Sequence, residues 1–252
     1  MRVRINAWHA VSALLIAGLA GAVLLLPALS FVGDALQPVV LEPSHSPVPP
    51  LVADAMWART LGGRATELQP INPFTVGRLL SCHVLAERHV TADERSKAHD
   101  DCMTLMPAFQ AVGYMSTVHL RNEGVWQDPR VPFAQIANMT RVSAKWTRDD
   151  LLSTLAERGE FGAPFVGITA AARGYFGREP GQVDVPQAAM LAGVMGNYRI
   201  NPWCSPDAVA KMRGRVLGLM RENGTISAEA AEIADRADLG LMAPASEPHC
   251  PS

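Results

Sequence analysis

Residues 146–202 read WTRDDLLSTLAERGEFGAPFVGITAAARGYFGREPGQVDVPQAAMLAGVMGNYRINP, and glycines and prolines divide this stretch into three helical segments. The first is predicted to begin after Thr147, whose hydroxyl can accept hydrogen bonds from unpaired backbone N–H groups. Two aspartates in its first turn suit the positive end of the helix dipole. One buried face is predicted from leucines at helical spacing: Leu151, Leu152 and Leu155. The helix should end at Gly159.

The second and third segments also carry their own start and stop signals. A helix over Val166–Phe176 is predicted to close on Gly177, because a left-handed glycine commonly ends a helix. The next helix should begin after Asp184 as N-cap, with Pro186 in the first turn, where a missing N–H costs little. Its apolar body is expected to end before Gly196.

The sequence of this stretch resembles the peptidoglycan transglycosylase domain, which is glycosyltransferase family 51. This domain occurs in penicillin-binding proteins and in monofunctional membrane transglycosylases. That family typically reads Y-S-K-D-E-I-L-E-L-Y-L-N-x-x-Y-F-G-x-x-x-Y-G-I-E-A-A-A-R-x-Y-F-G-K, followed by A-L-L-A-G and Y-N-P. Residues 146–177 fit the pattern without a gap. The matching residues are Phe161, Gly162, Gly167, Ile168, Ala170 to Arg173, Tyr175 to Gly177, Leu191 to Gly193, Asn201 and Pro202.

The resemblance implies a mostly α-helical, lysozyme-like, two-lobed domain. The smaller lobe would be membrane-proximal and built from the least similar part, about 61 to 125. The resemblance runs to about Asp238. In the family this region is largely scaffold, so the match favours the fold more strongly than the activity.

The amino terminus predicts a single transmembrane helix. Residues 10–32 form an uncharged apolar run, and a spanning helix needs about 20 such residues. Arg2 and Arg4 precede the run, so the N-terminus should stay in the cytoplasm and the rest of the chain should lie in the periplasm. The alternative is a cleaved signal peptide, although Ala28-Leu29-Ser30 is a poor cleavage site.

These observations give an expected domain order. It comprises a cytoplasmic N-terminus (1–9), a transmembrane helix (10–32), a proline-rich linker (33–50), a transglycosylase-like domain (51–238) and a flexible tail (239–252). The linker contains five prolines, which should keep it extended away from the membrane, and compact structure should begin near Leu51. The formal net charge of −2 gives no indication of nucleic-acid binding.

Sugar transfer from a lipid pyrophosphate needs a carboxylate that accepts the hydroxyl proton, and the resembled family supplies two glutamates. The first should fall near Leu61, which is not acidic. Glu67 is the nearest carboxylate, and it is either a relocated base or a solvated loop residue. Ser153 stands where the family has its second glutamate. Glu157 lies one turn further on the same helix face, and Glu160 replaces a family tyrosine.

Candidate substrate-binding residues come from two weaker matches. Lys145 and Arg148 occupy positions where the family is usually basic, and they either contact the pyrophosphate or are cations near a helix end. Ser116 and Thr117 belong to the only partial match to the family motif G-G-S-T-I-T-Q-Q, and this match lacks both glutamines of the motif.

The remaining candidate site residues are the cysteines and histidines, which could form disulfides or bind a metal. An exported domain meets an oxidising compartment, and four cysteines allow three pairings. We expect Cys82–Cys102 and Cys204–Cys250, which close the shortest loops. The family often uses a divalent cation, but the histidines between residues 83 and 99 fit no compact site, so neither metal nor cofactor is expected.

Three functions remain open from the sequence. The first is a non-catalytic relative that binds peptidoglycan, its lipid-linked precursor or a cell-wall synthesis protein. The second is an active but divergent transglycosylase that uses Glu67 or Glu157. The third is a helical membrane-anchored structural protein without glycan contact. The first is favoured because both acidic positions depart from the family pattern.

Overall fold

The computed structural model describes residues 28, 31–35, 40–60, 67–88, 91–103, 108–125, 127–244 and 250. The described chain is mostly helical and contains no strand, only two isolated β-bridges, Glu160 to Val166 and Phe161 to Met195. The helices are α2 (Pro50–Arg59), α3 (Pro73–Ala86), α4 (Ala92–Met103), α5 (Phe109–Asn122), α6 (Val131–Lys145), α7 (Arg148–Arg158), α8 (Ile168–Phe176), the 3₁₀ turn η1 (Pro180–Gln182), α9 (Val185–Val194), α10 (Pro206–Glu222) and α11 (Ala228–Arg236). The predicted helical fold class is confirmed.

The helix caps predicted for residues 146–202 are present. The hydroxyl of Thr147 accepts from the backbone N–H of Asp150, whose side chain caps Thr147 in return, and α7 closes at Gly159. Asp184 caps α9 in the same reciprocal way with Gln187. The helix predicted from Val166 starts later, at Ile168, because Gly167 adopts φ 83° and Val166 pairs with Glu160.

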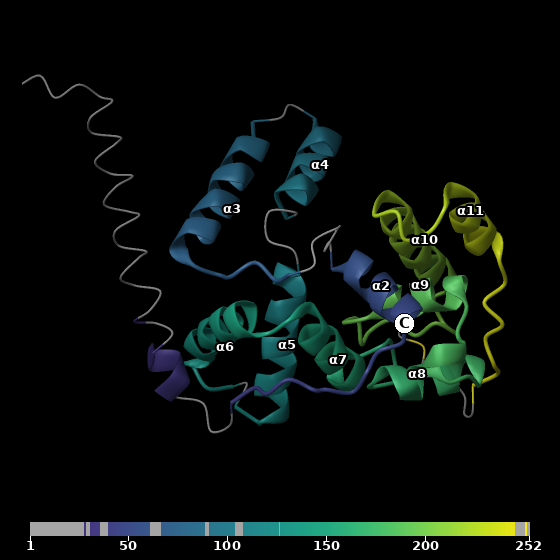
Figure 1. The fold of residues 1–252 in the computed structure, drawn as a ribbon, viewed down its shortest axis with the longest axis horizontal. Helices are drawn as coiled ribbons and strands as arrows, with labels where there is room; N and C mark the ends of the chain where they lie inside the picture. The colour runs from purple at the N-terminus through teal and green to yellow at the C-terminus, as the bar shows by residue number, and fades with distance from the viewer. Residues whose placement is uncertain are drawn as a thin grey trace, which may run out of the picture.

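Helix α9 lies at the centre of the larger body, between α2 and α10 (Figure 1). Every residue from 186 to 194 is buried. Its alanines and glycine allow neighbouring backbones to approach closely. A Cβ on Gly193 would lie 3.1 Å from the carbonyl carbon of Met212 in α10.

Helices α3 and α4 form a hairpin that projects from this body (Figure 1). A disulfide between Cys82 and Cys102 joins the two helices. The projecting part is smaller than the lobe expected over residues 61 to 125. Helix α5 instead packs against α6 and α7, because one of its faces is apolar and buried, with Val112 and Met115 at its centre.

In the proline-rich segment, residues 33–35 are helical and residues 40–49 form neither helix nor strand, but the expectation that compact structure begins near Leu51 is wrong. Residues 40–49, here called the strap, pack on the body, and Leu41 is only 2% exposed. Nearly all of the predicted transmembrane run 10–32 lies outside the described residues. Within the described part of the chain, no helix is both long enough and apolar enough to cross a membrane.

The described start of the tail is also attached, which corrects the expectation that it is loose. The backbone N–H of Met242 donates to the carbonyl of Tyr175 at 2.7 Å, and Trp203 Nε1 donates to the carbonyl of Met242 at 2.8 Å. The second disulfide joins Cys204 and Cys250.

Two helical glycines give a matched test of this packing. In α8, a Cβ on Gly174 would lie 2.0 Å from the ring of Phe165, which packs edge-on against Tyr175. In α10, a Cβ on Gly218 would meet nothing within 4 Å. We expect Gly218→Ala to raise the free energy of unfolding by about 0.5–1 kcal/mol, through helix propensity. Gly174→Ala should lower it by about 1–3 kcal/mol, through overpacking. Urea unfolding followed by circular dichroism measures both, and equal effects would contradict the packing described.

Candidate functional site

Two cavities meet at Ser153 on α7. The first, of about 510 Å³, is lined by Ser153, strap residues and the ends of α2 and α7. The second, of about 380 Å³, lies between Ser153, Glu157 and the 168–181 region. Pro47, Val48 and Ser153 line both cavities, so the strap passes between them at Ser153. The side chain at this position is consequently only 7% exposed.

The strap is fastened to α7 by polar contacts on either side of Ser153. The backbone N–H of Ser44 donates to Thr154 Oγ1 at 2.9 Å, and the Ser44 hydroxyl donates to the Glu157 carboxylate. His45 Nδ1 lies 3.7 Å from Asp150 Oδ1. Glu157, the candidate acid beside Ser153, is therefore already bound by the strap, although its side chain keeps 47% of its exposure.

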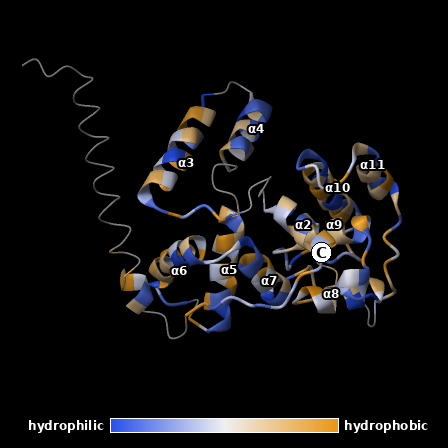
Figure 2. Ribbon diagram, viewed as in Figure 1, coloured by the Kyte–Doolittle hydropathy of each residue, from blue (hydrophilic) through white to orange (hydrophobic). Residues whose placement is uncertain are grey.

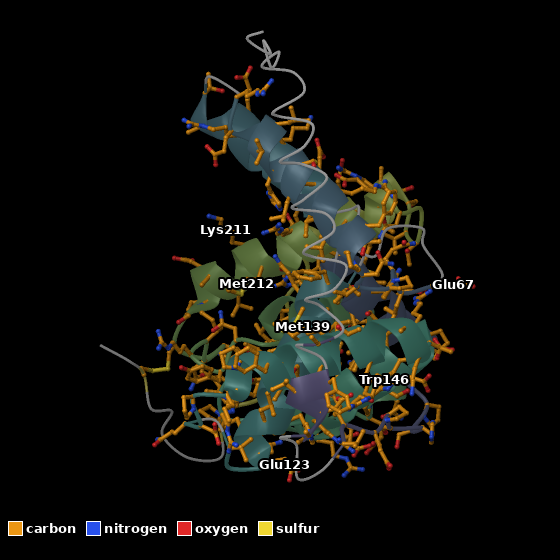
Figure 3. All side chains as sticks on the ribbon, turned by 90° about the vertical axis from the view of Figure 1, so that its left-hand side faces the viewer. Glu67, Glu123, Met139, Trp146, Lys211 and Met212 are labelled. Atoms are coloured by element: carbon orange, nitrogen blue, oxygen red, sulfur yellow. A yellow bond between two sulfur atoms is a disulfide. The ribbon has the colours of Figure 1, made fainter. Side chains whose placement is uncertain are left out.

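Glu67 is not brought to this site. It is exposed, precedes α3 and lines neither cavity (Figure 3 shows it at the outer edge of the molecule). Other carboxylates do line the cavities. They are Asp54, Asp149 and Asp150 in the first, and Glu157 and Glu179 in the second. The walls around Ser153 are thus acidic.

The two predicted basic contacts differ in their surroundings. Arg148 lines the first cavity, donates to Asp54 Oδ1 at 2.9 Å and stacks over Trp57 with its guanidinium carbon 5.1 Å from the ring centre. Its charge is therefore already balanced by Asp54. Lys145 is exposed at the end of α6 and lines neither cavity.

Ser116 and Thr117 lie inside helix packing rather than at the cavities. Ser116 is fully buried, and its hydroxyl has no hydrogen-bond partner among the described residues. The Thr117 hydroxyl donates to the carbonyl of Gly113 at 3.1 Å and accepts from Gln135 Nε2 at 3.1 Å. In this conformation neither side chain is placed to contact a ligand in the cavities at Ser153.

A cluster around Glu160 has no counterpart in the sequence predictions. Arg121 Nη2 donates to Glu160 Oε1 at 2.9 Å, and the Tyr114 phenol donates to Glu160 Oε2 at 3.3 Å while accepting from the Glu160 backbone N–H at 2.9 Å. Burial raises the pKa of Tyr114 to about 12, and the negative charge of Glu160 acts in the same direction. Glu160 lies 39 positions from Arg121 and 46 from Tyr114, so no local pattern links it to them. The Glu160 carboxylate therefore has a structural role, because it accepts hydrogen bonds from Arg121 and Tyr114.

The acidic residues near Ser153 do not make a metal site. Within the described part of the chain, no group of three or more histidine, cysteine, aspartate or glutamate side chains could hold a metal ion. The side chain of His99 and all of His89 lie outside the described residues.

Comparison with known proteins supports the resemblance found in the sequence. Residues 116–221 match the family model described as Transglycosylase. Penicillin-binding protein 1F of Bacillus subtilis (strain 168) is 33% identical over 97 residues, which cover 38% of this chain and 14% of that protein. Penicillin-binding protein 1A of Streptococcus pneumoniae (strain ATCC BAA-255 / R6) is 30% identical over 95 residues, which cover 37% of this chain and 13% of that protein. The chain thus spans only a small part of the relatives it matches.

The Tyr114 phenol gives a pH-dependent test of the Glu160 cluster. The folded state holds the phenol proton more tightly than the unfolded state, so this contribution to stability is complete below pH 10. It is lost as pH rises from 10 to about 12. Tyr114→Phe should remove that loss, and at neutral pH it should cost about 1–3 kcal/mol because a Glu160 N–H loses its acceptor.

Ultraviolet titration of the phenols and denaturant unfolding at several pH values measure both effects. Tyr198→Phe, which removes an exposed phenol, is the control. An unchanged phenol titration in Tyr114→Phe would refute the assignment.

Proposed function

We propose that this chain, whose residues 116–221 belong to the transglycosylase family of peptidoglycan synthesis, is a non-catalytic member that binds peptidoglycan glycan or its lipid-linked precursor. Two features of α7 support this proposal. Ser153 stands at the position of a family glutamate, and the strap covers it and holds the neighbouring Glu157.

The chemistry at Ser153 argues against sugar transfer. A serine hydroxyl cannot take up a proton at neutral pH, and a positioned general base is typically worth about 10²–10⁴-fold in rate. The other conserved acid of the family pattern has no counterpart near Leu61, and Glu67 lies outside both cavities. A site without a placed base keeps the capacity to bind but loses most of the reaction rate.

The cavities at Ser153 suit a sugar ligand. Their volumes of about 510 and 380 Å³ lie in the range of small-molecule sites. Carboxylates such as Asp54, Asp149 and Glu179 can accept hydrogen bonds from sugar hydroxyls and acetamido N–H groups. The apolar faces of Pro47, Val48 and Ile168 can pack against the sugar ring.

The competing function is a divergent but active transglycosylase. One observation favours it: Glu157 lines the second cavity and remains partly exposed, so displacement of the strap would release its carboxylate. This alternative differs from binding alone in a single measurable property, which is polymerisation of the lipid-linked disaccharide precursor.

We expect the full chain in detergent to show no polymerisation of that precursor and to bind isolated cell-wall sacculi. Thr169→Trp, which fills part of the second cavity, should weaken binding about tenfold. The control Thr225→Trp changes an exposed threonine that lines neither cavity and should bind like the wild type.

Turnover that is abolished in the double variant Glu67→Gln, Glu157→Gln, but retained in Glu222→Gln, Glu229→Gln, would establish the active alternative. Failure of the wild type to bind either sacculi or precursor would favour the structural role without glycan contact.

We also propose that the domain lies in the periplasm on the membrane anchor of residues 10–32. Two disulfides, Cys82–Cys102 and Cys204–Cys250, support an oxidising compartment. Helix α3 supports contact with the lipid surface, because it carries apolar residues (Figure 2) and exposes several of them on one face. The side chains of this face are 55–67% exposed: Phe74, Leu80, Val84 and Leu85.

A tryptophan at position 84 tests that contact in the full chain reconstituted in vesicles. We expect brominated lipids to quench the added fluorescence of Val84→Trp, because bromine quenches only at short range. Ile233→Trp, at an equally exposed apolar position on α11, is the control and should not be quenched. Equal quenching at the two positions would remove the proposed contact.

A further inference from the structure

A third cavity lies apart from the Ser153 site. It has a volume of about 180 Å³, and it is bordered by the end of α2, the start of α5, α7 and the turn after α9. Its lining residues are Arg59, Thr60, Gln110, Ala111, Tyr114, Leu155, Met195 and Gly196. None of these residues lines either cavity at Ser153.

Arg59 is the charged residue among the described lining residues, and no described acidic residue pairs with its guanidinium. Among the described residues it forms neither an ion pair nor a hydrogen bond, although it is more than half buried. Burial lowers the pKa of Arg59 from its ordinary value, and the nearby positive charge of Arg215 lowers it further. A guanidinium presents five donors, so this one can still bind an oxyanion.

Glu160, which bonds to the lining residue Tyr114, is not paired with Arg59. The Glu160 carboxylate is paired with Arg121 and with the phenol of Tyr114. The Thr60 hydroxyl donates to the carbonyl of Trp57 at 2.8 Å. Arg59 and Gln110 are therefore the lining side chains whose N–H donors no described residue uses.

Three of the other described lining side chains are apolar. Ala111, Leu155 and Met195 cannot hydrogen-bond, so they offer no partner to the further oxygens of a phosphate dianion. A carboxylate places both oxygens against the planar fork of one arginine and leaves its substituent to the apolar wall. A volume of about 180 Å³ suits a substituent of a few heavy atoms.

We propose that this cavity binds a carboxylate carried on a short apolar group, of the kind found in an N-acylated alanine. Arg59 holds the carboxylate, Gln110 donates a further hydrogen bond, and the methyl group lies against Leu155 and Met195. The site does not depend on the glycan proposal, because it uses other residues and another ligand chemistry.

Ligand-observed NMR on the full chain in detergent tests the site with N-acetylalanine, in both enantiomers, as probe. We expect saturation transfer to the methyl group, and binding at least about tenfold weaker for Arg59→Gln, since a charge-assisted bidentate contact is lost. Arg59→Lys should be intermediate, because it keeps the charge but not the fork. Arg221→Gln, at an exposed arginine of α10, is the control and should bind like the wild type.

Two further probes test whether the cavity requires a carboxylate. N-acetylalanine amide lacks the negative charge and should not bind, whereas inorganic phosphate should bind more weakly than N-acetylalanine. Equal binding of the amide, tighter binding of phosphate, no wild-type binding, or unchanged binding in a folded Arg59→Gln protein would each overturn the proposal. The melting temperature of each variant confirms that it is folded. None of these outcomes bears on sacculus binding.

Discussion

The close approach of α9 to α10 and α2 is the constraint on which the larger body depends. A helix buried along nearly its whole length must present small side chains where other backbones cross it. The sequence of α9 supplies alanines and Gly193 at those crossings, and the α10 backbone lies where a larger residue would have to fit. Because α2 also packs on α9, this contact sets where Arg59 and Asp54 lie relative to α7.

Local signals in the sequence predicted the helices well because their causes are local. A capping side chain and the N–H group that it binds are three residues apart, as in Thr147 with Asp150 and Asp184 with Gln187. The end of α7 at Gly159 and the start of α9 after Asp184 were predicted from such signals. The start of α8 was missed because Val166 pairs with Glu160, which lies in another turn of the chain.

The candidate site was less predictable because long-range contacts build it. The sequence located Ser153 and Glu157 through the family pattern, but nothing local indicates that Ser44, more than a hundred positions earlier, binds Glu157. The same holds for Arg148 with Asp54 and for Arg121 with Glu160. A proline-rich composition disfavours helix and strand, but it cannot say whether the backbone packs on the body. Buried Leu41 and the hydrogen bonds of Ser44 to α7 show that it does.

The serine at position 153 and the strap above it are physically consistent with each other. A carboxylate confined beside Pro47 and Val48 at 7% exposure would lose hydration without gaining a cation, because Arg148 already pairs with Asp54. A serine has no charge to desolvate, so the strap can close over it at little cost. A family glutamate at this position would instead require an open groove. A serine at position 153 and a seated strap are therefore compatible. A carboxylate at this position under the same strap would be a buried charge without a cation.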